Sequence, residues 1–303
     1  MEEYPLTVPS RSAVRVRVPA KINLHLGVGP LRDDNFHDLA TVFHAVSLYD
    51  ELTLECGPPG IRLILESPDE NVPTDERNLA VRALKLLAEH ANIEPAVTVR
   101  LRKGIPVAGG MAGGSADAAA ALIAGDALWH LATPPEKLHE LAAQLGSDVP
   151  FALHGGDALG TGRGEHLTPL THPYQRHWVF VTAHEGLSTP AVYAQSDRLR
   201  KTTEASDPAA VIKALDEPDP QALADALCND LQEATLNLRP ELHEVINAGE
   251  AAGALKGIVS GSGPTCAFLV RDAEHARRVA ENLKNYPTTT AFGSVDGAQL
   301  VTN

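Results

Sequence analysis

A glycine-rich loop between an expected strand and an expected helix constrains this chain more than any other feature. Residues 106–117 (Pro-Val-Ala-Gly-Gly-Met-Ala-Gly-Gly-Ser-Ala-Asp) follow the strand-like alternation of residues 97–101 and precede an alanine-rich helix that extends to about Leu128. Glycines let a backbone turn its N–H groups inward, and a helix N-terminus attracts anions. The loop therefore predicts a phosphate site, with Ser115 and Asp117 as the expected helix caps. A glycine-rich connection that binds nothing is the alternative.

Composition and simple motifs exclude several classes of protein. The glycine loop lacks the Gly-Lys-Ser/Thr ending of a Walker A loop and the G-x-G-x-x-G spacing of a dinucleotide site. With 25 Lys+Arg against 39 Asp+Glu, the net charge of −14 argues against binding to nucleic acid or to an anionic membrane. The three cysteines lack CxxC or histidine companions, so a reduced, cytoplasmic setting without a metal site is expected. The acidic N-terminus predicts no signal peptide, and no apolar run approaches the ~20 residues of a membrane span.

The order of the expected elements predicts an α+β fold of two domains. A length of 303 residues is enough for two hydrophobic cores. We place the boundary in the loop at 171–177, which divides the chain into residues 1–172 and 173–303. Residues 201–220 are polar and are expected to form a surface excursion. Helices are expected from Pro73-Thr74 onward and over residues 133–145, 191–200, 221–234, 240–252 and 272–284.

Two polar side chains share one face of the first expected strand. After Pro19, Ile22 and Leu24 alternate with Lys21 and Asn23. A strand period of two places Lys21 and Asn23 together, opposite the aliphatic face. This pair suits contact with a phosphate or a reacting hydroxyl. A solvated strand face explains the same pattern, so both interpretations stay open.

Two further segments carry candidate binding groups. Phe36 and His37 lie in a polar, turn-like segment, where a ring that stacks beside a ring that hydrogen-bonds suits recognition of a flat base. A hydrophobic plug beside a surface histidine is the alternative there. Asp148 follows the expected helix end at Gly146 and precedes the apolar Phe151. It is either a positioned carboxylate or a helix cap.

Motifs in a fixed order make the chain resemble the GHMP kinases, a family named for galacto-, homoserine, mevalonate and phosphomevalonate kinase. They are residues 19–24 (Pro-Ala-Lys-Ile-Asn-Leu) with Phe36-His37, the glycine loop, residues 146–151 (Gly-Ser-Asp-Val-Pro-Phe) and a second small-residue loop within 257–265. By itself, the second loop also fits a simple hairpin. The resemblance covers nearly the whole chain. It implies a two-domain GHMP kinase fold, with an N-terminal ATP-binding domain, a C-terminal domain on the substrate side, and the active site in the cleft between them.

The resemblance implies phosphoryl transfer from ATP to a hydroxyl of a small molecule, with Mg²⁺ bridging the ATP phosphates. Within the family it indicates the branch whose acceptor is a cytidine diphosphate-linked methylerythritol of the non-mevalonate isoprenoid pathway. Asp148 would accept the hydroxyl proton, and Lys21 would orient that carboxylate and offset charge on the transferred group. Asn23 would contact the reacting end of the acceptor. Phosphoryl transfer depends mainly on positioning and charge, which these residue types supply.

The resemblance also assigns binding residues. Phe36 and Phe43 would flank the cytosine of the acceptor, and Tyr193 would complete an aromatic box. His37 would hydrogen-bond the base. The expected state is a cytoplasmic monomer or weak homodimer that binds neither nucleic acid nor membrane. The acceptor side of the cleft is assigned to Ser260 and Gly261, and the ATP phosphates to Pro106, Val107, Ala108, Gly109, Gly110, Met111, Ala112, Gly113, Gly114 and Ser115.

Two other hypotheses stay open on the sequence. A different acceptor, such as homoserine, mevalonate or a sugar, also fits the family, although the aromatic residues favour a flat base. A relative that binds nucleotide without catalysis is the second hypothesis, and the presence of Lys21 and Asp148 argues against it. The chain departs from the family pattern at Ala108 and Ala112, where glycine is usual, and at Asn35-Phe36, where Gly-Tyr is usual. Since alanine resists a positive φ, the departures in the loop bear on its shape.

Overall fold

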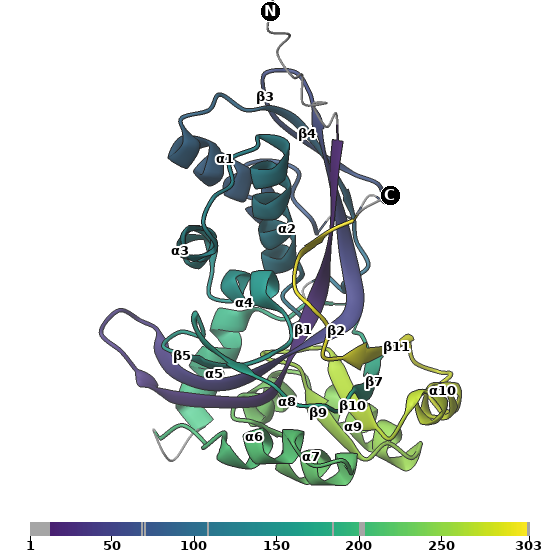
Figure 1. Cartoon of the computed structure of the whole chain (residues 1–303). Helices are drawn as coiled ribbons and strands as arrows, with labels where there is room; N and C mark the ends of the chain where they lie inside the picture. The colour runs from purple at the N-terminus through teal and green to yellow at the C-terminus, as the bar shows by residue number, and fades with distance from the viewer. Residues whose placement is uncertain are drawn as a thin grey trace, which may run out of the picture.

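Two long antiparallel strands are the central elements of the fold. The computed structural model describes residues 13–67, 69, 71–107, 109–183, 185–199 and 204–301. Strands β1 (Ala13–Leu31) and β2 (His37–Cys56) pair along most of their length and pass from one end of the molecule toward the other (Figure 1). Their pairing shifts between Pro19 and Ala20, because proline offers no N–H to the ladder.

The first half of the chain packs four helices beside the upper part of β1 and β2 (Figure 1). The central helix is the alanine-rich one, and its alanines at 116 and 118–121 are buried. Short side chains let this helix contact β1, β2 and its neighbouring helix closely. The elements are β3 (Gly60–Leu65), α1 (Leu79–Ala91), β4 (Ala96–Arg102), α2 (Gly113–Leu128), α3 (Pro135–Leu145), α4 (Val149–His154), β5 (Asp157–Thr161) and β6 (His166–Leu170).

The second half places most of its strands beside the lower part of β2 and adds helices around them (Figure 1). Along the sheet the order is β12-β1-β2-β11-β7-β10-β9. Among the described helices of the chain, none combines the length and the hydropathy that a membrane span needs. The elements are β7 (Arg176–Val181), α5 (Thr189–Leu199), α6 (Ala209–Leu215), α7 (Pro220–Ala226), β8 (Cys228–Asn229), α8 (Gln232–Leu238), α9 (Glu241–Ala251), β9 (Lys256–Val259), β10 (Cys266–Val270), α10 (Ala273–Asn282), β11 (Thr288–Gly293) and β12 (Gln299–Leu300).

Three expectations about helices are wrong. Helix α1 begins at Leu79, not at Pro73-Thr74, because the side chain of Asn78 accepts a hydrogen bond from the amide of Ala80 (2.9 Å) and caps the helix there. The expected surface excursion over 201–220 contains α6, whose Val211, Ala214 and Leu215 are buried in the core, while residues 201–203 lie outside the described part of the chain. The single helix expected over 221–234 is divided into α7 and α8 by β8, which pairs with β1.

The two halves share one sheet in the described part of the chain. Strand β11 pairs with β2 through Gly293 and Val46, and β12 returns to β1, where Leu300 lies opposite Val16. The division at residue 172 remains a prediction, because these pairings join segments from both sides of it.

A buried polar network connects β2, β5 and β7. Asp157 lies between two histidines: His44 Nδ1 donates to one carboxylate oxygen (2.7 Å) and His172 Nε2 donates to the other (2.6 Å). Trp178 Nε1 donates to His44 Nε2 (3.1 Å), which fixes the tautomer of His44. Burial alone would raise the pKa of Asp157, but its pairing with the two histidines outweighs burial and lowers the pKa below its usual range.

Replacing Asp157 by asparagine is expected to lower the free energy of unfolding near pH 7 by about 2–4 kcal/mol, because two buried imidazoles lose their shared carboxylate. Since the pKa of Asp157 is lowered in the folded state, its contribution is complete above the unfolded-state pKa of about 4 and declines as the pH falls below that value. Urea unfolding of both proteins at about pH 7, 5 and 3.5 measures this. The difference in unfolding free energy between the two proteins should stay constant down to pH 5 and shrink at pH 3.5. A difference in unfolding free energy that grows on acidification would contradict the account.

Candidate active site

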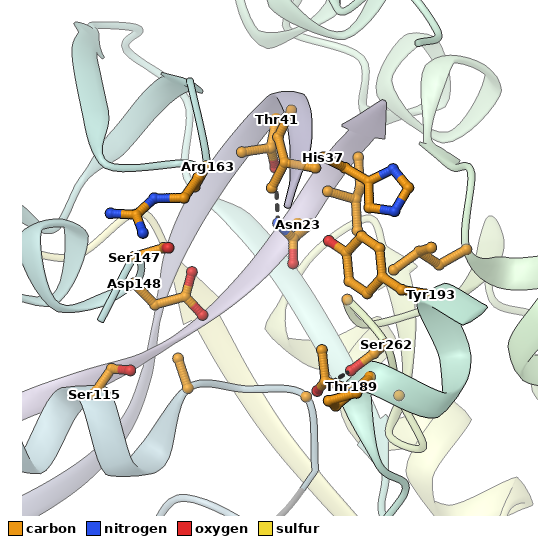
Figure 2. A pocket seen from close by; sticks show the side chains of 18 of the residues that line it. Asn23, His37, Thr41, Ser115, Ser147, Asp148, Arg163, Thr189, Tyr193 and Ser262 are labelled. Carbon is orange, nitrogen blue, oxygen red and sulfur yellow. Dashed lines mark hydrogen bonds between the residues drawn. The ribbon is translucent and has the colours of Figure 1, made fainter. Parts of the chain in front are cut away.

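A cavity of about 820 Å³ lies where the two halves of the chain meet (Figure 2). Its walls come from β1 and β2, from the glycine loop and the start of α2, from residues 147–148, from the turn before β6, from α5, and from the second glycine loop at 261–263. The predicted site residues that line it are Lys21, Asn23, Phe36, His37, Phe43, Gly109, Gly110, Ala112, Gly113, Gly114, Ser115, Asp148, Tyr193 and Gly261. The structure therefore brings most of the predicted site together in one pocket.

Lys21 and Asp148 face each other in this pocket. Lys21 Nζ lies 3.4 Å from a carboxylate oxygen of Asp148, and the two side chains are 10% and 32% exposed. Asp148 occupies the residue before α4, yet its side chain makes no capping hydrogen bond. The alternative that Asp148 is merely a cap is therefore wrong, and its carboxylate faces the lysine instead.

Asn23 belongs to the same polar row on β1. Its Oδ1 accepts a hydrogen bond from Lys21 Nζ (2.9 Å), and its Nδ2 donates to Thr41 Oγ1 (2.8 Å). Thr41 in turn donates to the carbonyl of His25 (2.7 Å). Lys21 and Asn23 are both buried, so the alternative of a solvated strand face is wrong. Thr41 fixes the amide of Asn23, and sequence analysis missed it because it lies on the neighbouring strand.

The glycine loop is held between β1 and the second glycine loop. The amide of Lys21 donates to the carbonyl of Met111 (3.2 Å), and Ser260 Oγ donates to the carbonyl of Gly110 (3.1 Å). The side chain of Met111 is buried in the core, and Ser260 is buried as well. Met111 and Ser260 therefore hold the loop in place, while Gly261 reaches the cavity wall. Pro106 and Val107 lead into the loop without lining the cavity, and Ala108 lies outside the described residues.

The first turn of α2 faces the cavity without a side-chain cap. Its N-cap residue is Ala112, which adopts a left-handed conformation (φ 58°) and whose methyl side chain cannot accept a hydrogen bond. The prediction that Ser115 and Asp117 cap the helix is wrong, because both lie inside it and Asp117 is buried. Gly113, Gly114 and Ser115 line the cavity. The free N–H groups and the positive end of the helix dipole are thus open to an anion, as the loop sequence predicts.

Behind the loop, a lysine that sequence analysis overlooked links three elements. Lys103 Nζ contacts the carboxylates of Asp50 on β2 and Asp117 on α2, the latter at 2.7 Å. Asp50 also accepts hydrogen bonds from the amides of Gly104 and Ile105 (2.7 and 2.9 Å). Burial opposes the charge on Lys103, but the two carboxylates outweigh burial and raise its pKa. Burial raises the pKa of Asp117 well above its usual value. This cluster anchors the start of the glycine loop.

Aromatic and imidazole side chains form the opposite end of the cavity (Figure 2). His37 Nδ1 donates to the carbonyl of Gly29 (2.9 Å), and its Nε2 lies 3.5 Å from Asp197. The ring of Tyr193 lies 5.2 Å from that of His37. Burial raises the pKa of Tyr193, and the charge of Asp148 acts in the same direction, so Tyr193 remains neutral. The alternative of a surface histidine is wrong, because His37 is buried.

The two phenylalanines assigned to base binding differ in exposure. Phe36 is 48% exposed at the tip of the β1–β2 hairpin, where the Cζ atom of Arg163 lies 5.0 Å from its ring centre. Phe43 is buried and stacks on Phe151, with 4.9 Å between ring centres. Lys21 Nζ lies 5.3 Å from the ring centre of Phe43, so this ring forms part of the floor beneath the lysine. That Phe43 flanks a base remains a prediction.

The fold and both glycine loops match one family. Family models for the GHMP kinases N terminal domain and the GHMP kinases C terminal match residues 78–156 and 211–288. The crystal structure of homoserine kinase from Cytophaga hutchinsonii has the same fold, with a TM-score of 0.77 over 99% of this chain and 100% of that one, at 19% identity. The chain belongs to the GHMP kinases, and the predicted α+β fold is confirmed.

More similar proteins share one name. A Salinispora tropica protein named 4-diphosphocytidyl-2-C-methyl-D-erythritol kinase is 53% identical over 297 residues, which cover 95% of this chain and 94% of the relative. The crystal structure of 4-(cytidine 5'-diphospho)-2C-methyl-D-erythritol kinase is 34% identical, with a TM-score of 0.77 over 91% of this chain and 98% of that one. Within the GHMP kinases, the chain therefore belongs with the 4-diphosphocytidyl-2-C-methyl-D-erythritol kinases.

The contact between the two glycine loops predicts the effect of a methyl group at Gly110. A Cβ there would lie 2.3 Å from the carbonyl oxygen of Ser260, and the residue has a φ of +75°. Gly110→Ala is expected to lower the free energy of unfolding by about 2–4 kcal/mol, through steric overlap and backbone strain. Gly114→Ala is the matched control, since its Cβ would meet only Leu79 at 3.6 Å inside a helix. Urea unfolding measures the free energy of unfolding of both variants. Equal losses in the two variants would contradict the steric overlap expected at Gly110.

Proposed function

We propose that this chain transfers the γ-phosphoryl group of ATP to the C2 hydroxyl of 4-diphosphocytidyl-2-C-methyl-D-erythritol, a step of the non-mevalonate isoprenoid pathway. The observation that carries the proposal is the contact of Lys21 with Asp148, 3.4 Å apart, in the cavity that the open N-terminus of α2 also lines. This arrangement places a base and a cation beside a site for phosphate. The names of the relatives support the choice of acceptor.

In the proposed reaction, the C2 hydroxyl oxygen forms a bond to the γ-phosphorus as the bond to the β,γ-bridging oxygen breaks. ADP leaves, and the hydroxyl proton passes to the carboxylate of Asp148. Lys21 holds that carboxylate in place and offsets negative charge on the transferred group. Because the transition state is loose, positioning and charge supply most of the catalysis, and a weak base is sufficient.

The ATP phosphates are expected at the first turn of α2, where the N–H groups lack a side-chain cap. Among the described lining residues on that side of the cavity, the side chains with oxygen ligands are Ser115, Ser147 and Asp148 (Figure 2). Such a donor set fits a Mg²⁺ ion that is held mostly by ATP phosphates and water. Mg²⁺ would offset phosphate charge, while Ser115 and Asp148 would orient its shell.

The cytosine of the acceptor is expected at the aromatic end of the cavity. The Gly29 carbonyl fixes a proton on His37 Nδ1, so His37 has a defined orientation for the base. Phe36 and Tyr193 supply ring faces, and neutral Tyr193 can donate a hydrogen bond. Asn23 lies between this end and the reacting pair (Figure 2). We further propose that the enzyme is cytoplasmic and acts as a monomer or weak homodimer.

A coupled assay of ADP release tests the proposal against the other acceptors of the family. The purified chain is expected to turn over the cytidyl alcohol and to leave mevalonate and homoserine unchanged. Turnover of only mevalonate or homoserine would overturn the acceptor. Nucleotide binding without ADP release, with every acceptor present, would indicate a regulatory protein instead.

Variants in the same assay test the role of Asp148. In Asp148→Asn, kcat is expected to fall at least about 100-fold while the KM for ATP changes less than about threefold, because only the base is removed. Asp272→Asn is the control, since Asp272 caps α10 outside the cavity and asparagine caps equally well. Activity of Asp148→Asn within threefold of the unchanged protein would reject the assigned role.

A further inference from the structure

We infer that Arg163 binds the diphosphate of the acceptor and so selects a nucleoside diphosphate over a nucleoside. The inference rests on the proposed function, since it concerns the acceptor named there. It adds a specificity-determining residue to a reaction whose base and orienting lysine lie elsewhere in the pocket. Four features of the structure support it: the rigid placement of Arg163, its contact with Phe36, its free donors and the distribution of charge in the cavity.

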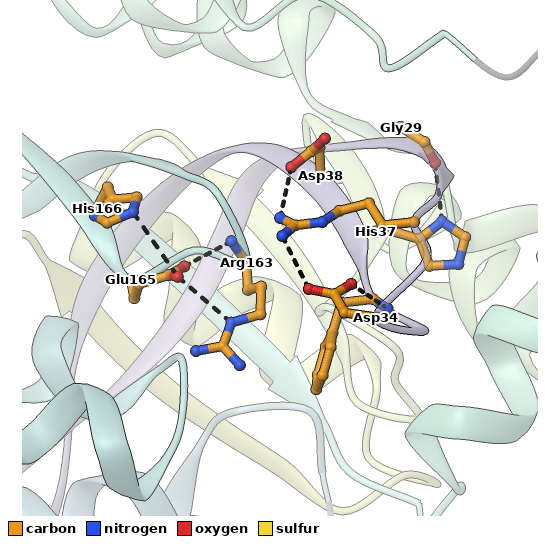
Figure 3. A network of polar contacts seen from close by, with 9 residues as sticks. Gly29, Asp34, His37, Asp38, Arg163, Glu165 and His166 are labelled. Atoms are coloured by element: carbon orange, nitrogen blue, oxygen red, sulfur yellow. Dashed lines mark hydrogen bonds and ion pairs between the residues drawn. The ribbon is translucent and has the colours of Figure 1, made fainter.

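The turn between β5 and β6 presents Arg163 in a fixed orientation. The residue lies between Gly162 and Gly164, which have φ angles of 70° and 105°. Its amide donates to a carboxylate oxygen of Glu165 (2.6 Å), and its Nε lies 3.4 Å from the other oxygen (Figure 3). One carboxylate thus holds both the backbone and the guanidinium of Arg163.

The same turn is attached to the hairpin that carries the base-binding residues. Strand β5 pairs with β2, and the amide of Leu39 donates to the carbonyl of Gly162 (2.7 Å). The guanidinium carbon of Arg163 consequently lies 5.0 Å from the ring centre of Phe36. A cation over an aromatic face is attracted to it, so this contact orders two otherwise exposed side chains. Arg163 is therefore positioned beside the place proposed for the cytosine.

The terminal nitrogens of Arg163 are available to a ligand. Within the described residues, the guanidinium of Arg163 makes its polar contact with Glu165 through Nε, and the backbone amide donates to the same carboxylate. Arg163 lines the cavity, and Figure 2 shows it on the same side as Ser147 and Asp148, across from His37 and Tyr193. The planar fork of a guanidinium matches two oxygens of a phosphate.

Of the cations that line the described part of the cavity, Arg163 is the one available to bind the diphosphate. Among the described lining residues, Lys21 and Arg163 carry the permanent positive charges, and Asp148 and Asp197 carry the negative ones. Lys21 is committed to Asp148. The acceptor carries its diphosphate between the cytidine and the reacting polyol, so this anionic group must lie between Phe36 and Asp148. In a chain with a net charge of −14, an anion there needs a local cation.

The position of Arg163 favours the acceptor over ATP as the source of the phosphate. Arg163 contacts Phe36 at the base-binding end, whereas the ATP phosphates are expected at the first turn of α2. Binding of an ATP analogue to the Arg163 variants distinguishes this role from a role in holding the ATP phosphates.

Calorimetric binding of cytidine 5'-diphosphate, of cytidine and of a non-hydrolysable ATP analogue tests the inference. Arg163→Met is expected to weaken the diphosphate about 10- to 100-fold and cytidine less than about threefold, because the lost charged hydrogen bonds contribute more to binding than the lost contact with Phe36. Arg163→Lys should recover part of that loss. Arg100→Met is the matched control: Arg100 Nε also pairs with a glutamate (3.2 Å to Glu55), but Arg100 lies outside the cavity and its loss should leave all three ligands unaffected.

Three results would overturn the inference, each in a different way. Equal weakening of cytidine and of its diphosphate would mean that Arg163 acts only through the ring of Phe36. Weaker binding of the ATP analogue, with unchanged diphosphate binding, would assign Arg163 to ATP. If the unchanged protein binds neither cytidine ligand, the proposed acceptor itself is wrong. Circular dichroism of each variant verifies its fold, and the lysine variant provides a second measurement if Arg163→Met is unstable.

Discussion

The ion pair of Lys21 with Asp148 is the interaction on which the rest of the site depends. A lysine that is 10% exposed requires a compensating charge, because the desolvation of an isolated ammonium group is costly. Asp148, at the start of α4, provides that charge. Asn23, which lies on β1 as Lys21 does, accepts a hydrogen bond from the lysine. The two charged residues come from elements far apart in the sequence. The fold must therefore place β1 and α4 correctly before the pair can exist.

The glycine loop connects that pair to the proposed site for phosphate. Its carbonyl at Met111 accepts a hydrogen bond from the amide of Lys21, so the loop is attached directly to the strand that carries the lysine. Gly110 permits the close approach of the second glycine loop, where a side chain would overlap the carbonyl of Ser260. Ala112 keeps the left-handed conformation at a cost of about 1–2 kcal/mol, which the surrounding contacts offset. The N-terminus of α2 is therefore open to an anion despite the departure from glycine.

Local patterns predicted the parts of the site that depend on neighbours in sequence. The alternation of β1 placed Lys21 and Asn23 on one face, and the glycine loop followed by alanines predicted α2 and its exposed N-terminus. The role of Asp148 could not be decided locally, because a cap and a paired carboxylate occupy the same position before a helix. The resemblance to the GHMP kinases decided it, and the geometry agrees.

Features that depend on packing between distant segments could not be predicted. Asp117 resembles a cap in the sequence, and only the burial of Lys103 beneath the loop shows its different role. Arg163 becomes part of the cavity because β5 pairs with β2, a pairing that no local pattern indicates. The start of α1 depends on the side chain of Asn78, whereas Pro73 offered the stronger local signal.

A double-mutant cycle on kcat tests most directly whether Lys21 and Asp148 act as one unit. The cycle compares Lys21→Met, Asp148→Asn and the variant with both substitutions, under saturating ATP and acceptor. If the pair acts as a unit, the double variant should lose no more than about threefold beyond the more damaged single variant. Losses that multiply would mean that the two residues contribute independently, and would contradict the account.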